Sequence, residues 1–447
     1  MLHAAEEDQL TDRRNVLKGL AGLAVAGTSC SAWASPNIDA SQDYPGVYSS
    51  NGRAFGISRF INDGGERVLL FTDYSSGKVR TLFPQRDGKL VMGPGFSTPS
   101  PVEFTLSFDR WGSMRIEDPA GKAESAVRIA TRDVPISFKR GGALLAGTLI
   151  LPPGPGPHPA VVLLHGSGPL TRDSFGPYPR FFSSLGLAVL IYDKRGTGGS
   201  TGVRLDASTG RPAILSPSFY PEDLRADAIA AVKALQGRAD IDARHIGLWG
   251  SSEGGMLTTQ AAAHFPDIAF VINSSGFMGT LADTILYQGV AKMRAANKTE
   301  NEIAQAVAFN RQWMESGRSG RGFAEFALHR EKVIAAGKLD WLFYEDAGFT
   351  SQEQLTWAMR HILDFDSLPD AGRVKCPALG LFGEKDVLTD SPRASANMLH
   401  AMKEGGNSDV TVKVIPNAGH SLMEASDRGY MAEGVFDTLR AWLSKRV

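Results

Sequence analysis

The sequence predicts an α/β protein: a mostly parallel sheet with helices on both faces and a helical cap insertion, preceded by a small antiparallel β domain. From about residue 131 onward, short apolar runs alternate with helix-length segments. Strands that are apolar throughout are typical of a parallel sheet whose two faces are both covered. From about residue 36 to 130, apolar and polar residues alternate between frequent turns, which is typical of antiparallel strands.

The first 34 residues are predicted to be a signal peptide. The run from Asp12 to Lys18 resembles a twin-arginine export signal, residues 19–27 are mildly apolar, and Ala32-Trp33-Ala34 fits the A-x-A cleavage pattern. We therefore expect export, to the periplasm or out of the cell, after cleavage near Ala34; a disordered, Ala-rich tail is the alternative. The apolar run is far shorter than the roughly 20 residues that span a bilayer. Residues 27–29 also lack the apolar residue expected before a lipidated Cys30, so no stable membrane anchor is expected.

The overall composition narrows the function classes. Lys and Arg number 47 and Asp and Glu 48, giving a net charge of -1. Proteins that bind nucleic acid usually carry a basic excess, so no nucleic-acid partner is expected. Two cysteines, Cys30 and Cys376, cannot build a disulfide framework. The sequence holds no H-E-x-x-H motif and no Cys/His cluster, so neither a metal nor another cofactor is expected. The oligomeric state stays open.

Residues 36–130 are the predicted β domain. Residues 67–72 and 78–83 flank the turn sequence Asp73-Tyr74-Ser75-Ser76-Gly77, which predicts a hairpin. Two roles are open for this domain: a lid that selects substrate, or a module that packs against the rest of the chain. Packing is favoured because no cluster of catalytic residue types lies in it.

Residues 131–447 are the predicted α/β domain. A leading hairpin is expected over residues 135–139 and 143–151, followed by a proline-rich loop at 152–159 that cannot pair into a sheet. The expected strands of the main sheet are residues 160–164, 187–192, 246–249, 269–273, 378–382 and 410–415. The expected helices are residues 178–185, 222–235, 253–264, 392–402 and 430–444. Residues 276–370 interrupt this alternation with helical spacing and many aromatic residues, which predicts a cap over the carboxyl ends of the strands. Most of these aromatic residues are expected in the core of the cap, with a few lining an apolar pocket.

The most informative stretch is Gly250-Ser251-Ser252-Glu253-Gly254, which fits G-x-S-x-G. It follows an expected strand and precedes an expected helix, so Ser252 stands on a tight turn that needs small residues two before and two after it. The positive end of the helix dipole then lies near its hydroxyl. Ser251 is the alternative by one residue, but that register does not place glycines at both flanking positions. Ser252 is therefore the candidate nucleophile.

A serine nucleophile needs a base, and the base needs a carboxylate that orients it. Of the nine histidines, only His165 and His420 lie outside the signal region, the proline-rich loop, the strand before Ser252 and the expected helices. His420 is the candidate base because it follows the last expected strand. Asp386 follows the preceding strand and is the candidate acid, with Glu384 and Asp390 as rivals. A histidine base predicts a rate that rises with pH as neutral imidazole forms.

The oxyanion that forms during acyl transfer needs two N–H donors. One is the backbone N–H of Glu253, the residue after the nucleophile. The other is expected in His165-Gly166-Ser167-Gly168-Pro169, which follows the first parallel strand and whose glycines allow close approach to a substrate. Ser167 is the candidate donor in this loop.

Together these motifs resemble the α/β-hydrolase superfamily, in its serine esterase and peptidase branch. The order Ser252, Asp386, His420 is the order of that superfamily. The resemblance covers about residues 131–447 and extends to Tyr192-Asp193-Lys194-Arg195-Gly196-Thr197-Gly198-Gly199-Ser200, which is similar to the D-x-R-G-x-G-x-S turn of many members. For this turn the resemblance implies a structural role. The His-Gly-Ser-Gly-Pro sequence behind a β domain looks most like bacterial esterases of the dienelactone-hydrolase-like or serine-aminopeptidase-like type.

The predicted function is a serine hydrolase that cleaves carboxylic esters through an acyl-enzyme on Ser252. Esters are favoured because they are the least demanding acyl donors and the cap is rich in apolar residues. A peptidase with the same triad, of the aminopeptidase or dipeptidyl-peptidase type, is the nearest alternative, and the expected partner is a small ester or a short peptide. Acyl-CoA thioesters are disfavoured for an exported protein. A non-catalytic binding protein on the same fold is a remote alternative, disfavoured by the intact triad.

Overall fold

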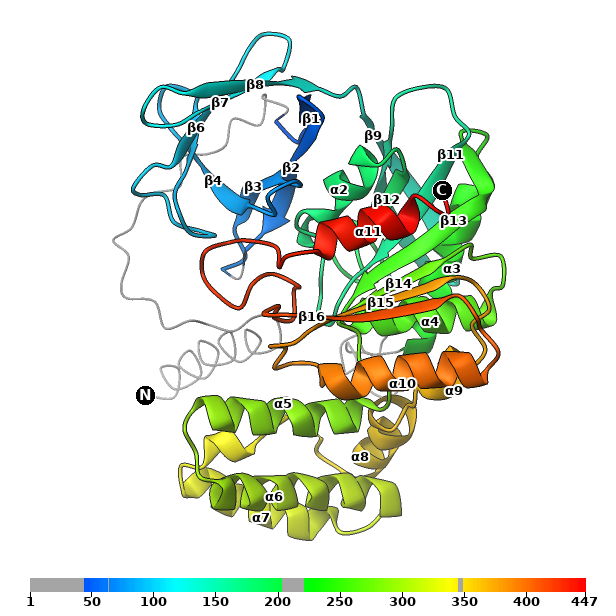
Figure 1. Cartoon of the computed structure of the whole chain (residues 1–447). Helices are drawn as coiled ribbons and strands as arrows, with labels where there is room; N and C mark the ends of the chain where they lie inside the picture. The colour runs from blue at the N-terminus through cyan, green and yellow to red at the C-terminus, as the bar shows by residue number, and fades with distance from the viewer. Residues whose placement is uncertain (1–43, 63, 203–220, 345–348) are drawn as a thin grey trace, which may run out of the picture.

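The structure, a computed structural model, describes residues 44–62, 64–202, 221–344 and 349–447. The predicted signal peptide, including Cys30, lies outside these residues. The described residues form a closed β-barrel, an open sheet flanked by helices, and a helical cap (Figure 1). The predicted fold class is confirmed. None of the described helices combines the length and the apolar composition that crossing a bilayer requires.

Eight antiparallel strands build the barrel, each hydrogen-bonded to the next, and the last pairs with the first through Tyr48 and Arg128. The strands are β1 (Gly46–Ser50), β2 (Arg53–Ile61), β3 (Arg67–Asp73), β4 (Val79–Pro84), β5 (Leu90–Met92), β6 (Phe104–Phe108), β7 (Met114–Glu117) and β8 (Ala123–Arg128). The predicted hairpin is β3–β4, in which Leu69 lies opposite Leu82. Alternating apolar residues fill the interior. Closure pairs the edge N–H and C=O groups that an open antiparallel sheet leaves exposed.

The second sheet has eight strands in the order β16-β15-β14-β13-β11-β12-β10-β9. They are β9 (Arg132–Arg140), β10 (Ala143–Leu151), β11 (His158–Leu164), β12 (Ala188–Tyr192), β13 (Ile241–Ser251), β14 (Val271–Ser274), β15 (Ala378–Gly383) and β16 (Val410–Ile415). The strands from β16 to β12 run parallel, whereas the leading hairpin β9–β10 is antiparallel and joins β12 at one side.

Helices cover both faces of this sheet, which explains why its strands are apolar throughout. Val161 of β11 packs into the core on one face and the next residue, Val162, into the core on the other. The first face is covered by α2 (Tyr178–Ser184) and α11 (Val435–Leu443). The second is covered by α3 (Pro221–Gln236), α4 (Glu253–His264) and α10 (Ser391–Glu404).

The cap lies between β14 and β15 in the chain, and Figure 1 shows it as a separate helical layer beside α10. Its helices are α5 (Leu281–Ala295), α6 (Glu300–Ser319), α7 (Phe323–Ala335), α8 (Gln352–Ala358) and α9 (Leu368–Ala371). Thr299 and Glu302 form a reciprocal capping box at the start of α6. Trp313 and Trp341 are buried in the apolar clusters of the cap, as expected for cap aromatics.

Two elements differ from the sequence expectation. The last helix begins at Val435 rather than near residue 430, because Tyr430 bridges to Lys78 and the Met431 N–H donates to the Gly77 carbonyl of the barrel (2.7 Å). The proline-rich loop also ends earlier than expected. Its His158 already belongs to β11, because the His158 N–H is satisfied by the Asp240 carbonyl (2.9 Å).

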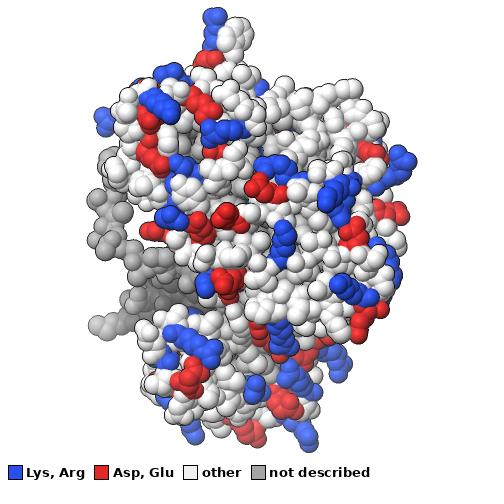
Figure 2. Space-filling model, viewed as in Figure 1, with Lys and Arg blue, Asp and Glu red and all other residues white. Residues whose placement is uncertain are grey.

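Charged side chains are mixed on the face shown in Figure 2. Lys and Arg lie among Asp and Glu over the barrel, the sheet and the cap. Ion pairs between described residues include Arg180 with Asp133 and Arg318 with Asp364, each at 2.6 Å. Among the described residues, charges of both signs are therefore interspersed on this face, with no patch of one sign over any of the three parts.

Candidate active site

Four loops emerge at one edge of the open sheet, where its parallel strands end. Ser252 follows β13, Asp386 follows β15 and His420 follows β16. Ser167 follows β11, which pairs with β13 on the side opposite β14. Because these strands run parallel, their carboxyl ends lie at the same edge of the sheet. The topology thus gathers the loops that carry all the candidate residues.

Ser252 stands on a strained turn between β13 and α4. Its backbone has φ +57° and ψ −122°, outside the regions that L-residues favour. A Cβ at Gly250 would collide with the carbonyl oxygen of Gly254, and a Cβ at Gly254 with that of Leu164. The Ser252 N–H donates to the carbonyl of Ser274 on β14 (2.8 Å), which ties the turn to the sheet. The close approach of these backbones requires both glycines of the G-x-S-x-G motif.

Asp386 and His420 are joined by a hydrogen bond. The Nδ1 atom of His420 lies 2.8 Å from Oδ2 of Asp386, whose side chain is fully buried. A carboxylate only accepts, so Nδ1 carries the proton and Nε2 is left as the acceptor. Oδ1 of Asp386 accepts the N–H groups of Leu388 (2.8 Å) and Thr389 (2.9 Å), which fix the carboxylate in place. His420 remains 20% exposed, so its imidazole can meet a substrate.

The two rival carboxylates make other contacts. Glu384 is 47% exposed and accepts the N–H of Asn417 (3.0 Å). Asp390 caps α10 by accepting the N–H of Arg393 (3.2 Å). The geometry therefore favours Asp386 as the partner of His420.

His165, the other loop histidine, is a packed core residue. Its Nε2 donates to the Tyr192 carbonyl (2.6 Å), and its ring stacks on Phe175 with the centroids 4.0 Å apart. Burial lowers the pKa of His165 to about 3, and the nearby Lys194 charge adds to this shift. The imidazole therefore stays neutral and holds the start of the Ser167 loop.

The loop between β16 and α11, residues 416–434, carries His420 and is called the histidine loop below. Lys385, next to Asp386, donates its N–H to the Ala418 carbonyl (2.8 Å). A Cβ at Gly383, the last residue of β15, would collide with the carbonyl of Gly419. These contacts hold the loop that carries Asp386, called the acid loop below, against the histidine loop.

The barrel holds the far part of the histidine loop. The Val79 N–H donates to the Gly429 carbonyl (2.7 Å), and the Phe96 N–H donates to the Asp427 carbonyl (2.9 Å). The Arg80 guanidinium, which is 1% exposed, also donates to the Gly429 carbonyl and lies over the ring of Tyr430. The first domain of the chain thus contacts the loop that carries His420, which the sequence did not indicate.

The loop after β11 lies against Ser252. A Cβ at Gly166 would stand 3.4 Å from the Cβ of Ser252. The N–H of Glu253 belongs to the first turn of α4, where helical N–H groups have no acceptor within the helix. Neither this N–H nor that of Ser167 has an acceptor among residues 44–62, 64–202, 221–344 and 349–447. Both are therefore available to an oxygen bound beside Ser252.

Residues 161–433 match the model of the Alpha/beta hydrolase family. The chain belongs to the α/β hydrolase family. Esterase EstD of Thermotoga maritima is 36% identical over 125 residues, which are 26% of this chain and 27% of that protein. Serine hydrolase BPHL of Homo sapiens is 27% identical over 271 residues, which are 60% of this chain and 75% of that protein. A solved esterase of Pyrococcus furiosus superposes at 17% identity with a TM-score of 0.44, covering 71% of this chain and 91% of its own.

In this α/β hydrolase, the turn after β12 is rigid and carries two adjacent buried cations. Its first residue, Asp193, accepts from Arg172 through both carboxylate oxygens (3.0 and 2.7 Å). Lys194 pairs with Glu253 at 2.5 Å, and Arg195 pairs with Asp227 at 2.5 Å. The structural role implied for this turn agrees with these contacts. The sequence interpretation did not include the link from Lys194 to Glu253, the residue after the candidate nucleophile.

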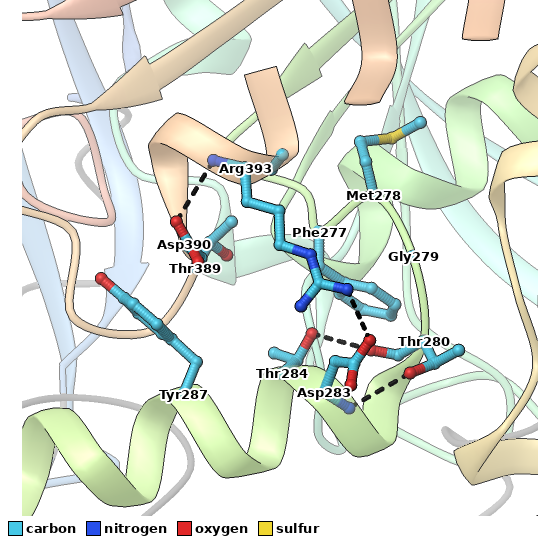
Figure 3. A pocket seen from close by; sticks show the side chains of 11 residues that line it. Phe277, Met278, Gly279, Thr280, Asp283, Thr284, Tyr287, Thr389, Asp390 and Arg393 are labelled. Atoms are coloured by element: carbon cyan, nitrogen blue, oxygen red, sulfur yellow. Dashed lines mark hydrogen bonds and ion pairs between the residues drawn. The ribbon is translucent and has the colours of Figure 1, made fainter. Parts of the chain in front are cut away.

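A small pocket lies where the cap meets the acid loop (Figure 3). It is lined by the segment Phe277–Thr280, by α5 and by the start of α10. In Figure 3 the Tyr287 side chain extends from α5 toward this loop, and its hydroxyl donates to the Asp386 carbonyl (2.7 Å). Arg393 of α10 pairs with Asp283 of α5 (2.8 Å). The α/β hydrolase therefore ties its cap to the loop that carries Asp386.

Proposed function

We propose that this protein is a serine hydrolase that cleaves carboxylic esters. The Ser252 hydroxyl attacks the acyl carbonyl while Nε2 of His420 takes its proton, and Asp386 holds the imidazolium through Nδ1–H. The N–H groups of Glu253 and Ser167 bind the oxyanion. His420 then gives the proton to the leaving alcohol, and an acyl-enzyme remains on Ser252. Water, deprotonated by His420, releases the acid and restores the serine.

One observation carries this proposal: a buried carboxylate orients a partly exposed imidazole at the sheet edge where the strained Ser252 turn emerges. In a family of hydrolases, this arrangement supports nucleophilic rather than binding chemistry. Ester cleavage is preferred over amide cleavage because Esterase EstD is similar to part of this chain, and Serine hydrolase BPHL supports the broader hydrolase class.

The test is hydrolysis of p-nitrophenyl esters of increasing acyl length, compared with aminoacyl-nitroanilides. Wild-type protein is expected to cleave the esters, and Ser252→Ala to lose the activity. Ser251→Ala is the matched control, because it removes a neighbouring hydroxyl from the same turn, and it is expected to stay active. A fluorophosphonate probe should label the peptide that contains Ser252. Equal ester turnover by wild type and Ser252→Ala, or a label on Ser251, contradicts the proposal.

A further inference from the structure

Lys194 connects the two loops that carry the candidate oxyanion donors. Its Nζ donates to Oε2 of Glu253 (2.5 Å) and to the carbonyl of Gly166 (2.8 Å). Glu253 directly follows Ser252 at the start of α4, and Gly166 directly precedes Ser167. A single ammonium group is therefore bonded beside both N–H donors.

The backbone of Lys194 is itself fixed. Its N–H donates to the Leu170 carbonyl (3.1 Å), and its carbonyl accepts from the N–H (3.0 Å) and the hydroxyl (2.7 Å) of Thr197. Leu170 belongs to the same loop as Ser167, so main chain and side chain both attach the turn after β12 to that loop. The backbone that carries the ammonium group is thus held by the loop after β11 and by its own turn.

Stability alone does not account for this ion pair. The Lys194 and Glu253 side chains are 3% and 7% exposed, so both charges lose their hydration. A buried ion pair is often no more stabilising than apolar residues of the same volume. Burial raises the pKa of the Glu253 carboxyl, and the Lys194 charge opposes that shift. The pair lies next to the candidate nucleophile, where it can position the groups around it.

We propose that Lys194 and Glu253 are positioning residues that fix the distance between the N–H groups of Ser167 and Glu253, and so set the width of the oxyanion hole. This inference rests on the proposed serine-hydrolase function. Such donors act at about 2.7–3.1 Å from the oxyanion, which exists only during the reaction. A wider hole therefore lowers kcat and leaves KM nearly unchanged.

The neighbouring pair, Arg195 with Asp227, is the matched control. It is similarly buried, with side chains 10% and 1% exposed, and its Arg195 follows Lys194 directly. It joins the same turn to α3, which carries none of the candidate residues. Removing it should disturb folding to a similar degree without changing the oxyanion hole.

The experiment compares Lys194→Met/Glu253→Met with Arg195→Met/Asp227→Met in the full chain. Double variants are used because removing one partner leaves an unpaired buried charge. For the Lys194 double variant we expect kcat to fall roughly 10- to 100-fold, less than the about 10²- to 10³-fold loss on deleting an oxyanion donor, with KM within about twofold. The Arg195 double variant should keep kcat within about threefold at a comparable loss of thermal stability. Glu253→Gln keeps shape and an acceptor, and should give an intermediate kcat even if the double variant does not fold.

Two results overturn the inference. The first result is a wild-type kcat in Glu253→Gln when the Lys194 double variant either also has a wild-type kcat or does not fold. The other is an equal fall of kcat in both double variants. In either case Ser252→Ala remains inactive and Ser252 remains labelled by the fluorophosphonate, so the proposed function survives. Failure of the proposed function is recognised separately, by the absence of that labelling in the wild type.

Discussion

The closed β1–β8 barrel and the open β9–β16 sheet differ in what their loops carry. The barrel strands enclose an interior filled by apolar side chains. In the open sheet, crossovers return the parallel strands to one direction, so the loops after β11, β13, β15 and β16 gather at one edge. In the barrel, the edge strands pair with each other. In the parallel sheet, the side chains of several loops gather at the carboxyl ends of the strands. The candidate catalytic residues therefore lie at the edge of the open sheet, and the barrel reaches that edge through its contacts with the histidine loop.

Those contacts are specific. Tyr74, directly after β3, makes edge-on ring contacts with both Phe181 of α2 and Phe436 of α11, with ring centroids 5.4 and 5.2 Å away. Its hydroxyl donates to the Pro177 carbonyl (3.1 Å). The barrel is therefore docked on the helices that cover one face of the sheet, and on the histidine loop described above.

The largest effects are expected at the sheet edge. His420→Ala should lower kcat by on the order of 10⁶-fold and Asp386→Asn by on the order of 10⁴-fold, because the base is lost in one case and held in the wrong tautomer in the other. Steady-state ester hydrolysis measures both. Glu384→Gln and Asp390→Asn are the controls and should stay within a few fold of wild type. A rival carboxylate variant as inactive as Asp386→Asn would show that the acid is misassigned.

The barrel interior should show the opposite pattern, a loss of stability without a loss of chemistry. Phe55 is 1% exposed and stacks on Phe71, so Phe55→Ala should lower the free energy of unfolding by about 3–5 kcal/mol. Trp111, which is 76% exposed, is the control, and Trp111→Ala should change stability by less than about 0.5 kcal/mol. Denaturant unfolding and kcat of the folded fraction are the measurements. A kcat reduced tenfold in Phe55→Ala would break the division between the two regions.

Features encoded by adjacent residues were predictable from the sequence, whereas contacts between distant residues were not. The turn at residues 73–77 and the strand–Ser252–helix turn are encoded by adjacent residues, and the hairpin and α4 were predicted from them. Barrel closure depends on Tyr48 meeting Arg128, a pairing that no local pattern marks. The Lys194–Glu253 contact needs the strand order, in which only β11 separates β12 from β13. A lysine and a glutamate next to two strand-end motifs were the available signal.

His165 lies at the sheet edge but is assigned a packing role and not a catalytic one. Its native pKa is about 3, whereas an unfolded imidazole titrates near about 6.5. Below about pH 6.5 the unfolded chain binds a proton that the native state does not. The free energy of unfolding therefore decreases by about 1.4 kcal/mol for each unit by which the pH is lowered, or by about 2 kcal/mol at pH 5. The gap in unfolding free energy between wild type and His165→Asn should therefore narrow by this amount from pH 7 to pH 5. His400, 72% exposed, is the control. A difference that stays constant from pH 7 to 5 contradicts the buried, neutral assignment.

The sharpest comparison uses a buried cation that the barrel and the histidine loop share. Arg80 donates to Gly93 within the barrel (3.1 Å) and to Gly429 in the histidine loop. Arg80→Met should let that loop shift, and small displacements of a catalytic group are costly, so we expect kcat to fall about tenfold with KM within about twofold.

Arg53→Met is the control for this prediction, because Arg53, which is 42% exposed, pairs with Asp73 and Glu124 of the barrel domain and not with the histidine loop. Arg80→Lys keeps a donor and should recover part of the rate. If Arg80→Met loses stability and neither variant changes kcat, the barrel packs against the sheet edge without positioning its loops. If only Arg80→Met changes kcat, a barrel residue helps to position His420 through its contact with Gly429. The barrel and the open sheet are then not functionally separate.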